Sequence, residues 1–339
     1  MRNDSRRASE AATRLHLAES PAMISGGAPG AGGTTATDPA WLSDLLVDPG
    51  SGEPLRIDAE GAHTASGLLA PRSAGLLRFV ESDSYAQSFG KEWNWFSTTQ
   101  LDRPADEQTE SRETFAAKTG FTPEDLAGKT VLDVGCGMGR FAEVAASYGA
   151  NIVGVDLSVA AEAAQRNLGD RPNTAFLQAD VFKLPFRPES FDLIYSIGVL
   201  HHTPDTRAAF AQLPHLLRPG GRIAIWVYSS LRKVRYLSSD AYRHVTSKMD
   251  EERLLKLCQV AVPLGRLYRT RLGKYLTPLL PVSHHPDPEW RVLDTFDWYA
   301  PRYQWKHDWP EVEGWFEQAG LEDVLRHEFE ISVSGRRPS

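Results

Sequence analysis

The sequence TVLDVGCGMGRF, residues 130–141, decides the fold. It opens with a short apolar run that contains one acid, Asp133, and then passes through glycines at the alternate positions 135, 137 and 139. The following residues place apolar side chains at helical spacing: Phe141, Val144, Ala145 and Tyr148. The stretch therefore predicts a buried strand, a tight turn and a helix N-terminus, which is the layout of a nucleotide site in an open α/β sheet.

The spacing of the glycines narrows the choice of ligand. G-x-G-x-G is one residue shorter than the dinucleotide-binding pattern, and no Gly-Lys-Ser/Thr follows it as in a P-loop. Asp133 would repel a pyrophosphate and attract a cationic amino-acid group. The turn favours a cationic nucleoside ligand, and the alternative is a glycine-rich turn without any ligand.

Further acids follow the next strands that the sequence predicts. Asp156 ends the apolar run 151–156, about 20 residues beyond the glycines, where an acid commonly binds ribose hydroxyls. Asp180 follows the run 174–178. Its side chain either contacts the ligand or caps a turn. The fourth strand, 191–196, leads to two adjacent histidines, and L-R-P-G-G at 217–221 precedes a fifth strand.

This ordered set over residues 113–230 closely resembles the class I S-adenosylmethionine-dependent methyltransferases. The resemblance implies an α/β fold, a Rossmann-like doubly wound seven-stranded sheet with an antiparallel closing strand, and S-adenosyl-L-methionine as cofactor. It implies cofactor contacts from Asp133, Gly135, Cys136, Gly137, Gly139, Asp156, Leu157, Asp180, Val181 and Ser196.

Composition divides the chain into six expected segments. These are a disordered tail (1–38), a small unit (39–80), an aromatic linker or lid (81–112), the cofactor-binding core (113–230), a helical insertion that covers the acceptor (231–293), and the C-terminal part of the sheet (294–339). The small unit weakly resembles a degenerate zinc ribbon. Asp48 and Ser51 stand where its first two cysteines would be, so we predict no metal there.

Charge and hydropathy limit the partners. A net charge of −7 argues against a stable nucleic-acid complex, and no apolar run is long enough for a transmembrane helix. The two cysteines are expected to be reduced thiols, and no secretory leader is evident, so the expected location is the cytoplasm. The oligomeric state is not predicted.

The insertion is basic in an otherwise acidic chain. Residues 231–275 contain eleven basic and four acidic residues. We interpret them as a helical subdomain with a basic face, which binds an anionic acceptor or a lipid surface. The alternative is a solvated face above an apolar underside.

Two histidines follow the fourth strand, where an acceptor should lie. His201 and His202 are candidate general bases. Adjacent side chains usually point in different directions, so we expect only one of them to face the acceptor, and His201 is preferred. The alternative is that one caps the turn and the other packs as a neutral aromatic. The candidate acceptor contacts are Trp93, Tyr299, Arg302 and Tyr303; packing between the small and large units is the alternative for Trp93.

The expected function is methyl transfer by in-line displacement to a small molecule, such as a natural product, a saccharide or a lipid-linked metabolite. An RNA or protein acceptor and a non-catalytic binding or activator module remain alternatives. The N-P-P-Y/F signature of many amino-group methyltransferases is absent where residues 196–199 stand, which disfavours base-amine and glutamine targets.

Overall fold

The computed structural model describes residues 38–80, 90, 92, 95, 101, 109–231, 233–268, 270 and 279–339. The expected tail therefore lies outside the described residues except for Asp38, as does most of the expected linker. No helix of the described part is long and apolar enough to cross a membrane.

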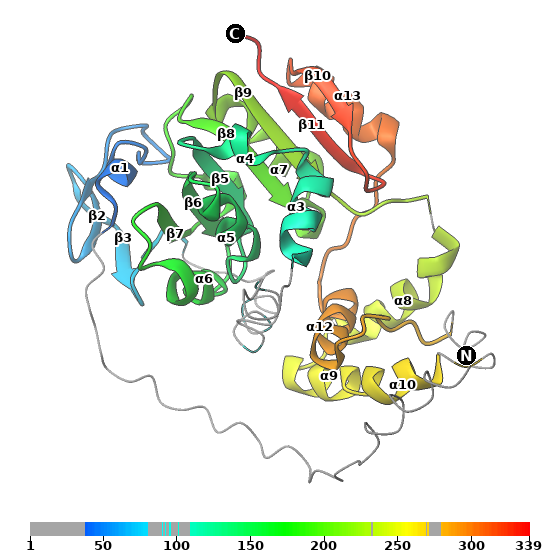
Figure 1. Ribbon diagram of the computed structural model, residues 1–339. Coiled ribbons are helices and arrows are strands. Elements are labelled where there is room, and N and C mark those ends of the chain that lie inside the picture. Colours follow the sequence, from blue (N-terminus) through cyan, green and yellow to red (C-terminus); the bar gives the residue numbers. More distant parts are fainter. Residues whose placement is uncertain are drawn as a thin grey trace, which may run out of the picture. The chain divides into compact units, whose positions relative to one another are not determined.

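The centre of the molecule is a parallel sheet of five strands (Figure 1). In spatial order they are β7 (Thr174–Gln178), β6 (Asn151–Asp156), β5 (Thr130–Val134), β8 (Phe191–Ile197) and β9 (Leu217–Trp226). The chain moves outward from β5 to β7 and then returns to the other side of β5 with β8. The strand order therefore reverses between β5 and β8, and this is where open α/β sheets bind ligands.

An antiparallel hairpin closes one side of the sheet, as predicted. It consists of β10 (Glu322–Arg326) and β11 (Ser332–Arg336), and β11 pairs antiparallel with β9. The α/β class and these seven strands are confirmed.

The predicted total of seven strands is wrong. The small N-terminal unit, which begins with α1 (Ala40–Ser43), adds β1 (Arg56–Ile57), β2 (Gly61–Thr64), β3 (Gly67–Ser73) and β4 (Leu76–Arg78). β4 pairs parallel with β7, so the sheet has eleven strands among the described residues. Leu46 and Leu77 belong to the main core cluster. A unit of about 40 residues has little hydrophobic core of its own. The small N-terminal unit shares the hydrophobic core of the large domain.

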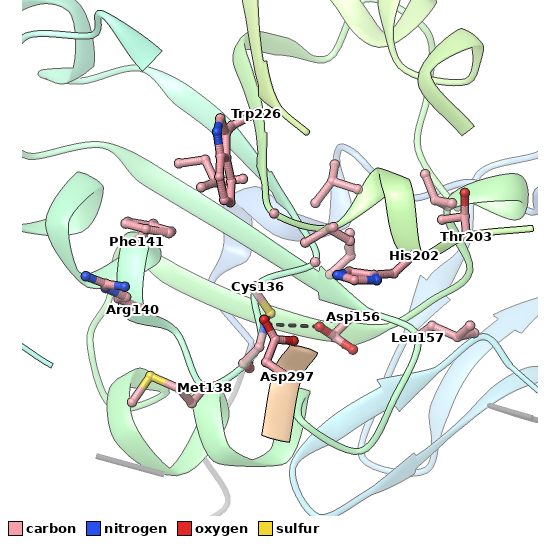
Figure 2. A pocket seen from close by; sticks show the side chains of 18 of the residues that line it. Cys136, Met138, Arg140, Phe141, Asp156, Leu157, His202, Thr203, Trp226 and Asp297 are labelled. Atoms are coloured by element: carbon pink, nitrogen blue, oxygen red, sulfur yellow. Dashed lines mark hydrogen bonds between the residues drawn. The ribbon is translucent and has the colours of Figure 1, made fainter. Parts of the chain in front are cut away.

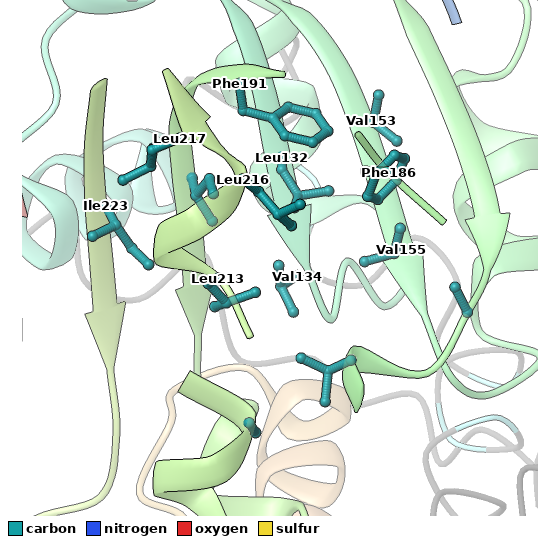
Figure 3. Close-up of a cluster of buried hydrophobic side chains, with 14 of the residues drawn as sticks. Leu132, Val134, Val153, Val155, Phe186, Phe191, Leu213, Leu216, Leu217 and Ile223 are labelled. Atoms are coloured by element: carbon teal, nitrogen blue, oxygen red, sulfur yellow. The ribbon is translucent and has the colours of Figure 1, made fainter. Parts of the chain in front are cut away.

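Hydrophobic side chains cover both faces of the parallel strands. On β5, Leu132 and Val134 pack into the cluster on one face (Figure 3), whereas Val131 packs into the cluster on the other. Both faces are also covered by the helices that connect the strands. These are α3 (Glu110–Thr119), α4 (Pro123–Leu126), α5 (Arg140–Ser147), α6 (Ala161–Leu168), η2 (Val181–Lys183), η3 (Leu200–His202), α7 (Thr206–Ala211), η4 (Pro214–Leu216) and α13 (Trp309–Gln318).

The predicted helical insertion follows β9. Its described helices are α8 (Lys233–Thr246), α9 (Glu251–Cys258), α10 (Ala261–Leu267) and α12 (Pro288–Tyr299). α12 begins in the insertion and continues into residues 294–299, which the sequence analysis assigned to the C-terminal segment. Leu254 and Cys258 of α9 pack against Val292 and Phe296 of α12.

The expected basic face is only partly described. Within it, Arg243 pairs with Asp240 at 3.3 Å, and Lys306, which lies outside this segment, pairs with the same carboxylate at 2.5 Å. Part of the positive charge is thus neutralised locally.

Candidate active site

A cavity of about 360 Å³ lies at the carboxyl ends of the parallel strands. The segments that follow β5, β6, β7, β8 and β9 all contribute to its lining. Figure 2 shows its labelled residues, among them Asp156, His202 and Asp297. Asp297 comes from α12, so the insertion contributes one wall of the cavity.

The glycine-rich turn forms the floor of the cavity. Gly135 and Gly137 line it, with positive φ values of 81° and 53°. The N–H groups of Gly135 and Cys136 donate to the carbonyl of Val155, which fastens the turn to β6. A Cβ on Gly135 would lie 2.3 Å from a methyl group of Val199. Only glycine fits this crowded, left-handed position.

Gly139 does not line the cavity. A Cβ there would lie 2.8 Å from a methyl group of Leu168, so this glycine allows α5 and α6 to pack closely. The third glycine of a nucleotide-binding turn commonly has this packing role.

Asp156 lines the cavity at the end of β6, beside Leu157. Its Oδ2 accepts a hydrogen bond from the N–H of Gly137 at 3.0 Å, and its Oδ1 accepts from the N–H and hydroxyl of Ser158 at 2.9 and 2.7 Å. Burial raises its pKa. These bonds fix the carboxylate against the turn, where remaining lone pairs can accept hydrogen bonds from a ligand's hydroxyls.

Asp133 does not occupy the position that the sequence analysis gave it. Its side chain is 3% exposed and does not line the cavity. Its Oδ2 accepts a hydrogen bond from the Tyr195 hydroxyl at 3.0 Å, and burial raises its pKa to about 8. The carboxyl group that was expected to face a ligand's cation thus lies inside the domain, on the side of the sheet that carries Tyr195.

We expect Asp133→Asn to stabilise the ligand-free protein at neutral pH. Between pH 4 and 8 the unfolded chain has Asp133 ionised while the folded chain keeps the proton, so this group lowers stability as pH rises. The advantage of the variant over wild type should grow by about 1.4 kcal/mol for each pH unit from pH 5 towards pH 8, measured by urea unfolding. Asp170→Asn, at an exposed site, is the control. A gain that does not depend on pH would contradict this explanation.

Some of the remaining predicted cofactor contacts line the cavity, and others make hydrogen bonds that hold the surrounding backbone in place. Cys136 and Val181 line the cavity. Asp180 does not; its Oδ1 accepts from the N–H of Phe182 at 3.0 Å and caps η2. Ser196 is fully buried and donates to the carbonyl of Val134 at 2.9 Å, which ties β8 to β5.

The two histidines lie in η3 and differ in their surroundings. His202 lines the cavity, and its Nδ1 lies 2.8 Å from the carbonyl oxygen of Tyr303. His201 is fully buried, does not line the cavity, and stacks on Tyr228 with the ring centroids 4.0 Å apart. Burial lowers the pKa of both rings, that of His202 to about 4. Of the two histidines only His202 lines the cavity, so His202 is the better placed candidate for a base.

Comparison with known proteins agrees with this geometry. A family model described as a methyltransferase domain matches residues 132–225. Residues 132–225 form a class I S-adenosylmethionine-dependent methyltransferase domain. Its cofactor is S-adenosylmethionine.

Curated relatives match this methyltransferase domain and its surroundings. An O-methyltransferase of Aspergillus sclerotiorum is 33% identical over 36% of this chain and 49% of its own length. A ubiquinone biosynthesis O-methyltransferase of Thiobacillus denitrificans is 34% identical over 40% of this chain and 56% of its own length. The chain thus spans about half the length of these relatives. A solved S-adenosylmethionine-dependent methyltransferase of Mesorhizobium loti, 19% identical, covers 68% of this chain and 99% of its own, with a TM-score of 0.41.

The three predicted acceptor contacts that the structure describes do not line the cavity. Tyr299 donates its hydroxyl to the carbonyl of Pro281 at 2.6 Å, and Tyr303 contributes only its carbonyl to His202. Arg302 lines a second cavity of about 800 Å³ beside α8. Trp93 lies outside the described residues.

Sequence reasoning missed several residues that line the methyltransferase cavity. They are Lys118, Arg140, Trp226, Tyr228, Asp294, Asp297 and Trp298. Residues 294–339 were assigned to the C-terminal part of the sheet, yet α12 runs to Tyr299. Asp287, which caps α12, and Pro288, its first residue, were the available signal. Reading a helix there would have placed Asp294, Asp297 and Trp298 on one face.

Proposed function

We propose that this protein transfers a methyl group from S-adenosylmethionine to a hydroxyl group of a small-molecule acceptor. The proposal depends on one cavity, which lies where the strand order reverses. One half of this cavity suits a nucleoside, and the other half contains His202. Asp156, Leu157 and Val181 line the first half, and His202 and Thr203 line the second. The cavity can therefore bring the two reactants together in one place.

The residues of the first half fit the cofactor. The crowded turn at Gly135 brings backbone to the cavity, and Asp156 is held where it can accept hydrogen bonds from ribose hydroxyls. Val181 and Leu157 supply apolar contacts for the adenine. When bound, S-adenosylmethionine supplies a methyl group on a positively charged sulfur, which needs alignment with the acceptor more than activation.

His202 is suited to accept the proton that a hydroxyl acceptor loses. A carbonyl oxygen only accepts hydrogen bonds, so Nδ1 carries the hydrogen that it donates to Tyr303. In the neutral ring Nε2 then carries the lone pair. Burial lowers the pKa of the ring to about 4, which keeps the ring neutral at physiological pH and makes it a weaker base than free imidazole. Nε2 can therefore accept the proton from the acceptor's oxygen.

The acceptor half is walled by aromatic side chains. Trp226, Tyr228 and Trp298 line it, which favours an acceptor with an apolar or aromatic body. Several of the matched relatives bear the name O-methyltransferase, which supports oxygen as the methylated atom.

A transfer assay with S-adenosylmethionine labelled in its methyl group tests this function. Purified protein is incubated with a panel of phenols, catechols and aliphatic alcohols, and with an extract of small metabolites. We expect label in a small molecule and none in added RNA or protein. Label confined to RNA or protein, or absent from every fraction, would refute the proposal.

Two histidine variants then test the proposed base with the acceptor identified by that assay. His202→Asn keeps a donor for the Tyr303 carbonyl but lacks the basic nitrogen, so kcat should fall by about 10²- to 10³-fold with little change in KM. His201→Phe is the matched control, because neither ring nitrogen of His201 has a hydrogen-bond partner among the described residues. It should change kcat by less than about threefold; equal losses in both variants would contradict the role of His202.

A further inference from the structure

The helical insertion borders the second cavity, which lies apart from the one proposed for methyl transfer. Its volume of about 800 Å³ is within the range of small-molecule sites, about 300–1,000 Å³. α8, the turn after it, the start of α9 and residues 300–306 form its walls. None of its lining residues lines the first cavity, so a ligand here is a separate question from cofactor binding.

The lining of the second cavity is mostly basic. Its four cationic side chains are those of Arg243, Lys248, Arg302 and Lys306, and its two carboxylates are those of Asp240 and Glu251. Four cations against two carboxylates leave two positive charges in excess. In a chain whose net charge is −7, this local excess favours an anionic ligand.

Two of the cations are mostly buried and share one carboxylate. The side chains of Arg243 and Lys306 are 13% and 12% exposed, and both pair with Asp240. Among the described residues neither forms an ion pair with any other acid. A second negative charge beside them would therefore be stabilising, because buried cations depend on nearby anions.

Arg243 is fixed in position and still has donors to spare. Its Nη1 donates to the side-chain oxygen of Gln304 at 2.6 Å and to Asp240 at 3.3 Å. Its Nη2 makes no hydrogen bond to any described residue, and its Nε is buried without such a partner. Burial also lowers the pKa of Arg243, which shows that its charge lacks full compensation. A guanidinium in this state is suited to bind an oxyanion.

The other two cations are exposed. Lys248 and Arg302 form no ion pair within the described part of the chain, and the guanidinium of Arg302 lies 5.5 Å from the centroid of the Tyr303 ring. Both side chains are thus available to a ligand. Apolar surface lies beside them, supplied by Met249, Leu254 and the exposed indole of Trp305.

We propose that the second cavity binds the phosphate monoester group of a small organic molecule. Such a group carries a charge of about −1.5 to −2 at pH 7, which matches the excess of two positive charges. Its three oxygens can accept hydrogen bonds from Arg243 and from the exposed cations, and guanidinium groups bind phosphate through two parallel hydrogen bonds. The indole of Trp305 provides a face for the organic part of the ligand.

Residues 303–305 connect this site to the proposed base. On one side the carbonyl of Tyr303 lies 2.8 Å from Nδ1 of His202, and on the other Gln304 accepts the hydrogen bond from Arg243. Trp305 also donates its indole N–H to the carbonyl of Thr203 at 3.0 Å. The same phosphate chemistry therefore suits either a phosphate carried by the methyl acceptor or one carried by a separate metabolite.

Calorimetry on the full chain with phenyl phosphate and phenyl sulfate tests the site directly. At about pH 7.5 the phosphate is mainly a dianion, whereas the sulfate carries a single charge. We expect one phenyl phosphate to bind per chain, and phenyl sulfate to bind at least about 10-fold more weakly. Arg243→Gln and Arg302→Gln should each weaken binding of phenyl phosphate by about 10-fold or more. Arg253→Gln, on an exposed position of α9 outside the cavity, should change it by less than about twofold.

Three results would overturn the proposal: no saturable binding of phenyl phosphate, equal affinity for phenyl sulfate, or affinity that both cavity variants leave unchanged. Arg302 is exposed, so Arg302→Gln keeps the test valid even if Arg243→Gln does not fold. The binding test needs no methyl transfer and therefore stands or falls independently of the proposed function. Once the acceptor is identified, competition by phenyl phosphate would assign the phosphate to the acceptor, and an unchanged KM would assign it to a separate ligand.

Discussion

Replacing Asp156 by alanine is expected to weaken binding of both S-adenosylhomocysteine and 5′-methylthioadenosine by about 100-fold or more. The carboxylate accepts one hydrogen bond from the turn at Gly137 and two from Ser158. Its loss removes the contact to the ribose and releases the turn. Hydrogen bonds to a charged group contribute about 1.5–3 kcal/mol each, and 2.7 kcal/mol corresponds to 100-fold.

The matched variants make this result specific. Asp170→Ala, at an exposed site, should leave both affinities unchanged. Asp156→Ala should affect the two nucleosides alike, because the ribose is common to both. A loss below about threefold, with the protein folded, would show that Asp156 does not hold the nucleoside.

Gly135→Ala is expected to lower the free energy of unfolding by about 2–4 kcal/mol. The residue has a φ of 81°, which an L side chain rarely adopts, and the new Cβ would lie 2.3 Å from a Val199 methyl group. Conformational strain and overpacking each contribute about 1–3 kcal/mol. Urea unfolding measures the change.

Gly128→Ala separates the two causes. Gly128 has a similar φ of 71°, but a Cβ there would have nothing within 4 Å. Gly128→Ala should therefore lower the free energy of unfolding only through conformational strain, by about 1 kcal/mol. Equal losses at Gly128 and Gly135 would contradict the close approach of Val199 to the turn.

The parts of the fold that the sequence predicted are those with local signals. The apolar strands, the glycines and Asp156 lie within short stretches whose spacing carries the information. The closing hairpin was predicted by resemblance and is confirmed. The four extra strands were missed, because the pairing of β4 with β7 joins segments that are far apart in the chain.

The sequence predicted the residues around the glycine-rich turn and Asp156 better than those in the rest of the cavity. Asp133 looked like a ligand because of its place in the motif, but strand alternation directs it towards Tyr195 and away from the cavity. Nothing in the local pattern marks Lys118, since its burial depends on Trp226 at the end of a distant strand. The helix around Asp297 was missed because the segment boundary at residue 294 fell inside α12.

Titration calorimetry of the wild-type protein with S-adenosylmethionine tests the central claim most directly. One molecule should bind per chain, and Asp156→Ala should abolish the heat signal at the same concentrations. The absence of binding to the folded wild-type protein, or unchanged binding to Asp156→Ala, would contradict the assignment of this cavity as a methyltransferase site.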